Sequence, residues 1–404
     1  MAYRITKKAR VFQYAYEAGR SSLKAALFLF VVFSLFLETG MAFGAAPFVN
    51  GFPAAEDFFP IGVWLQSPAR APLYKSIGIN TFVGLWQGPT EEQLKALAQQ
   101  GMFAVAMQND VGLKSPFNHV IKGWIDADEP DNAQPIGLGL YGSCIPAAKV
   151  SQRFLEMKAN DGTRPVMVTF GEGIANESWY GRGPCTGDHG YYATASKHAD
   201  VLGFDIYPVG TPVREVKEKL EYVARGVSKL EQLAGGNKKV WNAIEASVLD
   251  AQHPLSPKEL RTEVWMSLIH GSSGIVYFVH ELSPFREDAI FAHPELVSEV
   301  ASTNKLIQEL APVLNSPSLP READITAAVP IAVMAKRKDG ALYVFAVSMR
   351  NEGTAAHFQF SSIGDNNAEV IGESRSVAIR AGAMEDRFEG YSVHIYRIAL
   401  DSRG

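Results

Sequence analysis

Short apolar runs alternate with amphipathic stretches along most of the chain. Eight runs are rich in valine, isoleucine and aromatic residues, which is typical of parallel strands buried on both faces. They cover residues 59–66, 80–86, 102–109, 121–129, 164–171, 199–208, 238–246 and 274–282.

Helical patterns separate most of these runs, with leucine, valine or methionine at spacings of three and four. The stretches at 90–101, 147–162, 213–236 and 256–271 are the clearest, and a last one covers 293–314. Thr90 and Gln93 form the sequence signature of a capping box, and Gly235–Gly236 is a typical helix stop.

Eight strand–helix units over roughly 260 residues predict a (β/α)₈ TIM barrel at 46–315. The unit after the third strand is the weakest, because about ten residues separate it from the fourth. A doubly wound open sheet is the structural alternative, but no glycine-rich phosphate loop follows any strand.

From residue 323 the pattern changes to short alternating segments bounded by turn residues. It predicts a small antiparallel all-β domain, a β-sandwich at 322–402, after the linker 315–324. The fold class is therefore α/β, a TIM barrel followed by this β domain.

The first 45 residues differ from the rest. Basic residues precede the apolar run 25–37, and the small residues 42–46 follow it, which predicts a signal peptide and a secreted or periplasmic protein. An uncleaved anchor is the alternative, and membrane contact would then involve this segment alone. The net charge of −5 argues against nucleic-acid binding. Cys144 and Cys185 permit a disulfide, but the sequence does not give the distance between them.

The ends of the predicted strands carry acids, amides and aromatic residues. None is a lysine, which argues against Schiff-base chemistry, and no spacing suggests a metal site. We therefore expect neither metal nor cofactor. These positions are Gln66, Trp86, Gln108, Asp128, Glu129, Glu172, Asp205, Tyr207, Glu245, His280 and Glu281.

Two glutamates at these ends are the candidate catalytic residues. Glu129 ends the fourth strand before Pro130, and Glu245 ends the seventh, with no cation next to it. Those strands lie across a barrel from each other, and two facing carboxyl groups are what glycosidic bond cleavage requires. The structural alternatives are a turn acid for Glu129 and an ion pair with Arg261 for Glu245.

The chain resembles the retaining glycoside hydrolases of clan A. The segments at 127–130 (ADEP), 240–247 (VWNAIEAS), 203–208 (GFDIYP) and 263–278 are similar to the strand-4, strand-7, strand-6 and helix-7 to strand-8 segments of that clan. A C-terminal β domain is also common there. The resemblance implies that Glu129 is the acid/base and Glu245 the nucleophile.

One position departs from the clan pattern. Asp128 stands where the clan has asparagine, so a carboxylate replaces the amide that contacts the sugar 2-hydroxyl. A chitinase-type Asp-x-Asp-x-Glu motif is excluded, because Pro130 occupies the place of its glutamate.

Seven further residues are candidate substrate contacts, each with hydrogen bonding or core packing as its alternative. The tryptophans among them offer an indole face for a sugar ring. The set is Asp128, Asp205, Tyr207, Trp64, Trp86, Trp179 and His280.

The sequence thus predicts an exported glycoside hydrolase that cleaves an oligo- or polysaccharide with retention. Its catalytic carboxyl groups should lie about 5–5.5 Å apart. A non-catalytic carbohydrate-binding barrel and an accessory protein of polysaccharide assembly or export are the alternatives.

Overall fold

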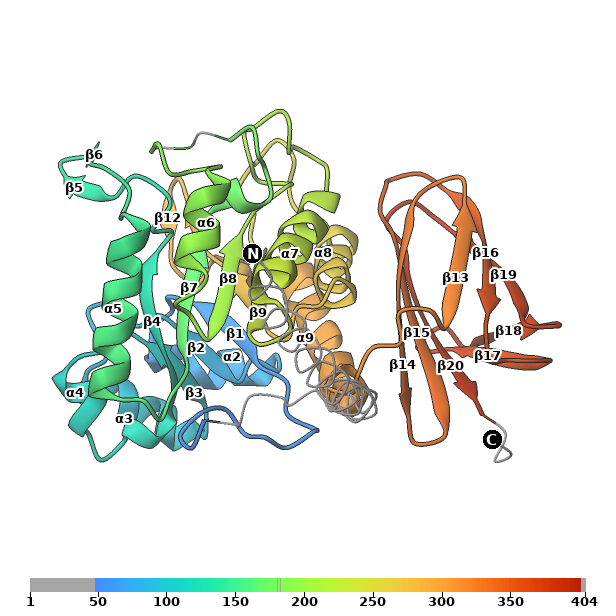
Figure 1. The fold of residues 1–404 in the computed structure, drawn as a ribbon, viewed down its shortest axis with the longest axis horizontal. Helices are drawn as coiled ribbons and strands as arrows, with labels where there is room; N and C mark the ends of the chain where they lie inside the picture. The colour runs from blue at the N-terminus through green and yellow to red at the C-terminus, as the bar shows by residue number, and fades with distance from the viewer. Residues whose placement is uncertain (1–47, 180, 182, 401–404) are drawn as a thin grey trace, which may run out of the picture. The chain divides into compact units, whose positions relative to one another are not determined.

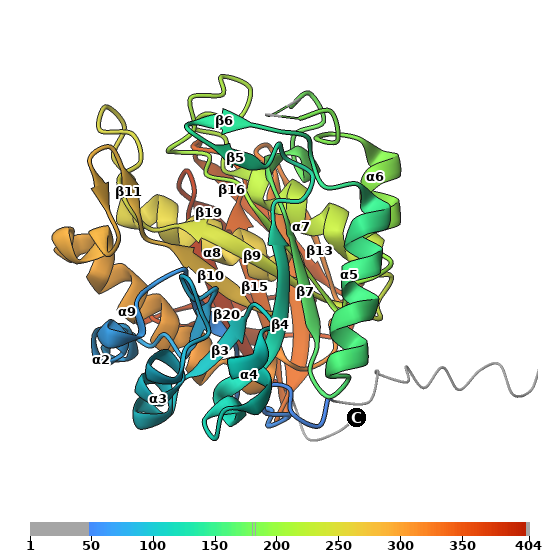
Figure 2. The same cartoon turned by 90° about the vertical axis from the view of Figure 1, so that its left-hand side faces the viewer.

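The computed structural model describes residues 48–179, 181 and 183–400; the predicted leader lies outside them. Eight parallel strands form a closed barrel in the order β1-β10-β9-β8-β7-β4-β3-β2 (Figures 1 and 2). All eight strands fall within the apolar runs, and the predicted TIM barrel is confirmed. They are β1 (Ile61–Trp64), β2 (Thr81–Val83), β3 (Phe103–Ala106), β4 (Ile121–Asp128), β7 (Val166–Phe170), β8 (Val201–Asp205), β9 (Lys239–Glu245) and β10 (Ile275–Phe278).

Alternate side chains of the barrel strands point inward and form a core of their own. Val105, Met167, Trp241 and Val276 belong to this inner cluster, and Trp64 packs against it. The alternate residues pack against the helices outside, in the larger cluster. Since both faces of each strand are buried, the strand sequences are continuous apolar runs.

Helices follow most strands and cover the outside of the barrel. Thr90 caps α3 through the predicted capping box, and Gly235 ends α7 with a φ of 59°. They are α2 (Ala71–Ser76), α3 (Glu91–Gln100), α4 (Asp110–Lys114), α5 (Ala147–Asn160), α6 (His189–Ala195), α7 (Glu221–Ala234), α8 (Pro257–Ile269), α9 (Pro294–Glu309) and α10 (Ala311–Leu314).

The helix predicted from residue 213 begins later than the pattern indicates. Residues 213–220 form turns, and α7 starts only at Glu221. Glu218 has a φ of 63°, and its amide donates to the Pro208 carbonyl at 2.8 Å. A left-handed residue cannot continue an α-helix, so the charged pattern of 213–220 belongs to a loop.

The C-terminal region is antiparallel, as predicted, and consists of two sheets, β13-β16-β19 and β14-β15-β20-β17-β18. Side chains of both sheets, among them Phe358 and Tyr396, share one apolar core, which makes the pair a sandwich. The strands are β13 (Ala323–Ala327), β14 (Ile331–Lys338), β15 (Ala341–Ser348), β16 (Thr354–Phe360), β17 (Asn366–Val370), β18 (Arg375–Ile379), β19 (Ala383–Phe388) and β20 (Val393–Ala399).

Helix α8 is buried on nearly every side, because it lies between the barrel and β15. Trp265 stacks on Phe345 of β15 with ring centroids 5.7 Å apart, and the Thr262 hydroxyl donates to the Tyr391 carbonyl at 2.7 Å. From Leu260 to Ile269 every residue except Arg261 is buried, including the polar Thr262, Glu263 and Ser267. The β domain therefore supplies part of the cover that the barrel needs.

Replacing Trp265 by alanine should strongly destabilise the protein. The side chain is 0% exposed, so truncation leaves a cavity between α8 and β15. We expect a loss of about 3–5 kcal/mol in the free energy of unfolding, measured by chemical denaturation. Trp86→Ala is the matched control: Trp86 is 68% exposed, and its loss should change stability by less than about 0.5 kcal/mol. Equal effects of the two substitutions would contradict this packing.

Candidate active site

The four acidic residues at the end of β4 lie in different environments. Asp126 is buried and forms an ion pair with Arg153 of α5. Asp128 is exposed and pairs in register with Thr169 of β7. Asp131 is buried and accepts a hydrogen bond from the Gly171 amide at 3.0 Å. Glu129 stands between these, half-buried at the C-terminal end of the barrel.

Glu129 has a left-handed backbone, with a φ of 40°. Such a conformation costs a non-glycine residue about 1–3 kcal/mol and persists only where the surrounding structure holds it. Its carbonyl accepts hydrogen bonds from the Asn132 amide and the Gln134 side chain, both at 3.0 Å. These bonds hold the turn that presents the Glu129 carboxyl.

Gly171, directly after β7, makes room for that carboxyl. A Cβ atom on Gly171 would lie 2.6 Å from Oε1 of Glu129. Because Phe170 pairs with Phe204, Gly171 is level with Asp205 of β8. The strand between β4 and β8 therefore places no side chain between Glu129 and Asp205.

Asp205 is the carboxyl group that faces this acidic end of β4. Its neighbours at alternate positions, Val201 and Gly203, point into the barrel. Burial raises the pKa of Asp205 well above its ordinary value, and the charges of Glu129 and Asp128 raise it further. Its Oδ1 atom is screened from solvent and has no hydrogen-bond partner within the described residues.

An aromatic wall continues from Asp205 around the barrel end. The Tyr207 hydroxyl hydrogen bonds to Asp205, and its ring lies 4.9 Å from that of Phe278. Phe278 lies 5.0 Å from the ring of His280, which lies 5.9 Å from Phe285. Burial lowers the pKa of His280, and its Nε2 contacts the Gln66 amide at 3.1 Å. The structure thus brings Asp128, Glu129, Asp205, Tyr207 and His280 to one end of the barrel.

Glu245 has a different environment from the one expected of a nucleophile. Its side chain is 0% exposed, and its two oxygens accept hydrogen bonds from the amides of Val209 and Gly210 at 2.7 and 2.8 Å. Burial raises its pKa to about 7, and the neighbouring Glu263 of α8 has a pKa raised well above normal by burial and by the charge of Glu245. A substrate has no surface of Glu245 to contact. The ion pair considered with Arg261 is also not formed, since Arg261 lies 3.6 Å from Glu299.

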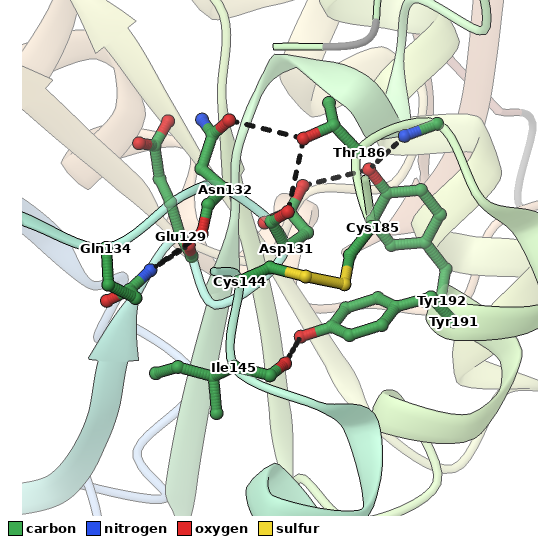
Figure 3. The surroundings of a disulfide bond; sticks show 11 residues. Glu129, Asp131, Asn132, Gln134, Cys144, Ile145, Cys185, Thr186, Tyr191 and Tyr192 are labelled. Atoms are coloured by element: carbon green, nitrogen blue, oxygen red, sulfur yellow. Dashed lines mark hydrogen bonds between the residues drawn. A yellow bond between two sulfur atoms is a disulfide. The ribbon is translucent and has the colours of Figure 1, made fainter. Parts of the chain in front are cut away.

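The loops beside Glu129 are held by a buried network and a disulfide (Figure 3). Asp131 accepts from the Tyr192 hydroxyl at 2.8 Å, and Thr186 donates to the Asp131 carbonyl at 3.1 Å. Cys144 and Cys185, left open by the sequence, form a disulfide with Cα atoms 6.1 Å apart. The covalent link joins the loop after β4 to the loop after β7.

The three candidate tryptophans lie in different settings. Trp64 is half-buried against the inner barrel core, whereas Trp86 is exposed on the loop after β2. Trp179 lies on the loop after β7, where a Cβ atom on Gly181 would come within 2.7 Å of its indole nitrogen and 2.5 Å of the Asn132 side chain. Trp179 is therefore next to the loop that carries Glu129.

The sequence did not identify Asp131, Gly171 and Phe278 as part of the site. They position or surround the candidate residues and carry no catalytic motif of their own. Asp131 is two residues after Glu129, and Gly171 is the first residue after a strand. The signal that could have identified Asp131 and Gly171 is an acid or a glycine just after a barrel strand, where functional residues of this fold lie.

No group of three or more His, Cys, Asp or Glu side chains is placed to hold a metal ion within the described ranges. None of the helices in those ranges is long and apolar enough to cross a membrane.

The fold and the position of the site define this protein as a (β/α)₈ barrel with a C-terminal β-sandwich, and solved structures share that fold. An α-amylase from Geobacillus thermoleovorans, complexed with acarbose, matches 86% of this chain and 99% of its own at 11% identity and a TM-score of 0.52. A maltogenic α-amylase, AmyB from Thermotoga neapolitana, matches 85% and 99% at 10% identity and a TM-score of 0.53. A catalytic mutant of Gan42B, a GH42 β-galactosidase from G. stearothermophilus, matches 85% and 98% at 9% identity and a TM-score of 0.53.

No family model matches the sequence, and the comparison with curated proteins finds no match. The likeness is therefore one of fold, and the chemistry has to be argued from the side chains.

Asp131 should make stability depend on pH. Burial raises its pKa from 3.8 to about 6, so between these values the folded protein holds a proton that the unfolded chain releases. The contribution of this group to stability is then largest below about pH 4 and falls as the pH rises to 6. We expect the wild-type unfolding free energy, relative to Asp131→Asn, to fall by up to about 3 kcal/mol between pH 4 and 7.

The measurement is urea denaturation at a series of pH values. Tyr192→Phe removes a hydrogen bond that lowers the Asp131 pKa, so it should extend the fall to higher pH. Parallel stability curves for wild type and Asp131→Asn would contradict the assignment.

Proposed function

We propose that this protein is a retaining glycoside hydrolase, exported from the cytoplasm, that cleaves an oligo- or polysaccharide at the C-terminal end of its barrel. One observation carries the proposal. The strained Glu129 presents its carboxyl over Gly171, and Asp205 on the far side of that glycine has a pKa raised by burial and by the Glu129 charge. Two carboxyl groups in different protonation states are what glycosidic cleavage uses.

Burial favours the neutral form of Asp205, so we take Asp205 as the proton donor. In this proposal Asp205 donates it to the departing glycosidic oxygen, while the Glu129 carboxylate attacks the anomeric carbon and forms a glycosyl ester. Asp205, now ionised, takes a proton from water, and the resulting hydroxide releases the sugar from Glu129. This differs from the role implied by the clan resemblance, where Glu129 would be the acid and Glu245 the nucleophile.

Glu245 acts structurally in this proposal. Its carboxylate binds two successive amides of the loop after β8, the loop that follows Asp205 and Tyr207. A second function, carbohydrate binding without catalysis, is favoured by the same burial of Glu245, because a clan-type nucleophile is then missing. The two functions differ in whether the wild-type protein hydrolyses a saccharide that it binds.

Three substitutions test the assignment of the carboxyl groups. Glu129→Gln and Asp205→Asn should each lower kcat by at least about 10²-fold, because each removes a group that reacts. Glu245→Gln should lower stability more than kcat, since it removes a buried hydrogen-bond acceptor. Hydrolysis of a panel of 4-nitrophenyl glycosides and polysaccharides provides the rates, and denaturation provides the stabilities.

The outcomes distinguish the alternatives. If Glu245→Gln folds normally and loses all turnover, the assignment from the sequence holds and ours fails. If wild type binds saccharides but turns none over, the protein is a binder. The anomer of the first product, observed by proton NMR, tests retention, and inversion would indicate carboxyl groups separated by roughly 6.5–9.5 Å.

Gly171→Ala tests the position of Glu129 without removing it. The backbone of Gly171, with a φ of −83°, accepts alanine, but the added methyl group would meet Oε1 of Glu129 at 2.6 Å. We expect the variant to fold and to lose roughly 10²-fold in kcat, because a displacement of about 1 Å disrupts reacting geometry. Gly190→Ala, on α6, is the control: its Cβ would meet only an Asp188 oxygen at 3.2 Å. Unchanged turnover in Gly171→Ala would contradict the placement of Glu129.

A further inference from the structure

A cavity lies outside the barrel end, next to α7. Its volume is about 730 Å³, within the range of roughly 300–1,000 Å³ that is typical of small-molecule sites. Its walls come from α7, from the loop 174–178 after β7, and from Pro330, Met349 and Arg350 of the β domain. Neither Glu129 nor Asp205 lines it, so it is a separate site.

Positive charge predominates on the walls of this cavity. Arg225 and Lys229 of α7 line it, and neither forms an ion pair with a described residue. The Arg225 guanidinium lies 4.4 Å from the centre of the Tyr222 ring, which keeps it beside the cavity. Arg350 supplies a third cation from the other wall and is held by an ion pair with Glu221.

The two carboxylates of the cavity are already engaged. Glu221 is 5% exposed and is bound to Arg350, and Glu177 lies 3.5 Å from His189. With Glu221 paired to Arg350, the cavity keeps two cations, Arg225 and Lys229, against one exposed carboxylate, Glu177. A guanidinium and an ammonium on one helix face bind a carboxylate through charge-assisted hydrogen bonds.

Uncharged hydrogen-bonding groups line the rest of the cavity. Ser178, Ser228 and Gln232 contribute hydroxyl and amide groups, and the Ser228 oxygen lies 2.9 Å from Nδ1 of His270. Such groups bind the hydroxyls of a polyol, which a small inorganic anion lacks. The cavity thus combines a site for one negative charge with sites for several hydroxyls.

We infer that this cavity binds a saccharide carrying a carboxylate, such as a hexuronic acid unit. The negative charge of the ligand is inferred from Arg225 and Lys229. That the ligand is a saccharide rests on the proposed function. The site would hold an acidic polymer on the outside of the barrel, next to the loop that leaves β7.

Ligand-observed NMR on the full chain tests this inference. The probes are glucuronate, galacturonate and mannuronate, with glucose, galactose and mannose as neutral partners and inorganic phosphate as a competing anion. At least one uronate should bind at least about tenfold more tightly than its neutral partner and should weaken as salt is added.

Matched variants locate the binding. Arg225→Gln/Lys229→Gln should reduce uronate affinity at least about tenfold. Lys95→Gln/Lys149→Gln removes two exposed charges from α3 and α5 and should change it less than twofold. Asp205→Asn should leave it unchanged, which separates this cavity from the proposed active site.

Several results would overturn the inference. They are the absence of uronate binding, equal binding of neutral sugars, equal competition by phosphate, and binding that survives loss of Arg225 and Lys229. Uronate binding without turnover would support this inference while the proposed hydrolase fails, so the two fail independently.

Discussion

A buried hydrogen bond, from the Gly171 amide to the Asp131 carboxyl, holds together the two loops on which the end of the barrel depends. It joins the chain after β4 to the chain after β7, and Gly171 is the residue beneath the Glu129 carboxyl. Asp131 has to be buried to make this bond, which is why its pKa rises to about 6. The position of the candidate catalytic residue thus depends on a carboxyl group that no substrate touches.

The crowding of acids in this segment has a structural explanation as well as a functional one. Asp126 is neutralised by Arg153, and Asp131 is stabilised by an amide and by the Tyr192 hydroxyl. Across the barrel end, the charges of Glu129, Asp128 and Asp131 all act on Asp205. Burial and these neighbouring charges raise the pKa of Asp205 and favour its neutral form, which is the form that acid-assisted bond cleavage needs.

The fold could be predicted from the sequence because each barrel strand, buried on both faces, requires a continuous apolar segment. Eight short apolar runs rich in valine, isoleucine and aromatic residues are typical of strands covered on both faces. Thr90 and Gly235 mark helix ends by local chemistry. Glu129 and Asp205 could be chosen because they end strands. The environment of Glu245 could not be predicted, since it depends on α8 and on the amides of Val209 and Gly210, which are brought to it only by the tertiary fold. The hydrophobic pattern predicts that Glu245 lies at the end of a barrel strand. The groups that surround its carboxyl are determined by tertiary packing.

The burial of α8 on both sides makes the barrel and the sandwich depend on each other. A β-sandwich attached by a flexible linker can be lost or exchanged between proteins, because nothing in the catalytic domain depends on it. Here Trp265 and Thr262 of a barrel helix are completed by Phe345 and Tyr391 of the sandwich. The barrel and the C-terminal domain therefore form one compact unit, and the sandwich is not an interchangeable module.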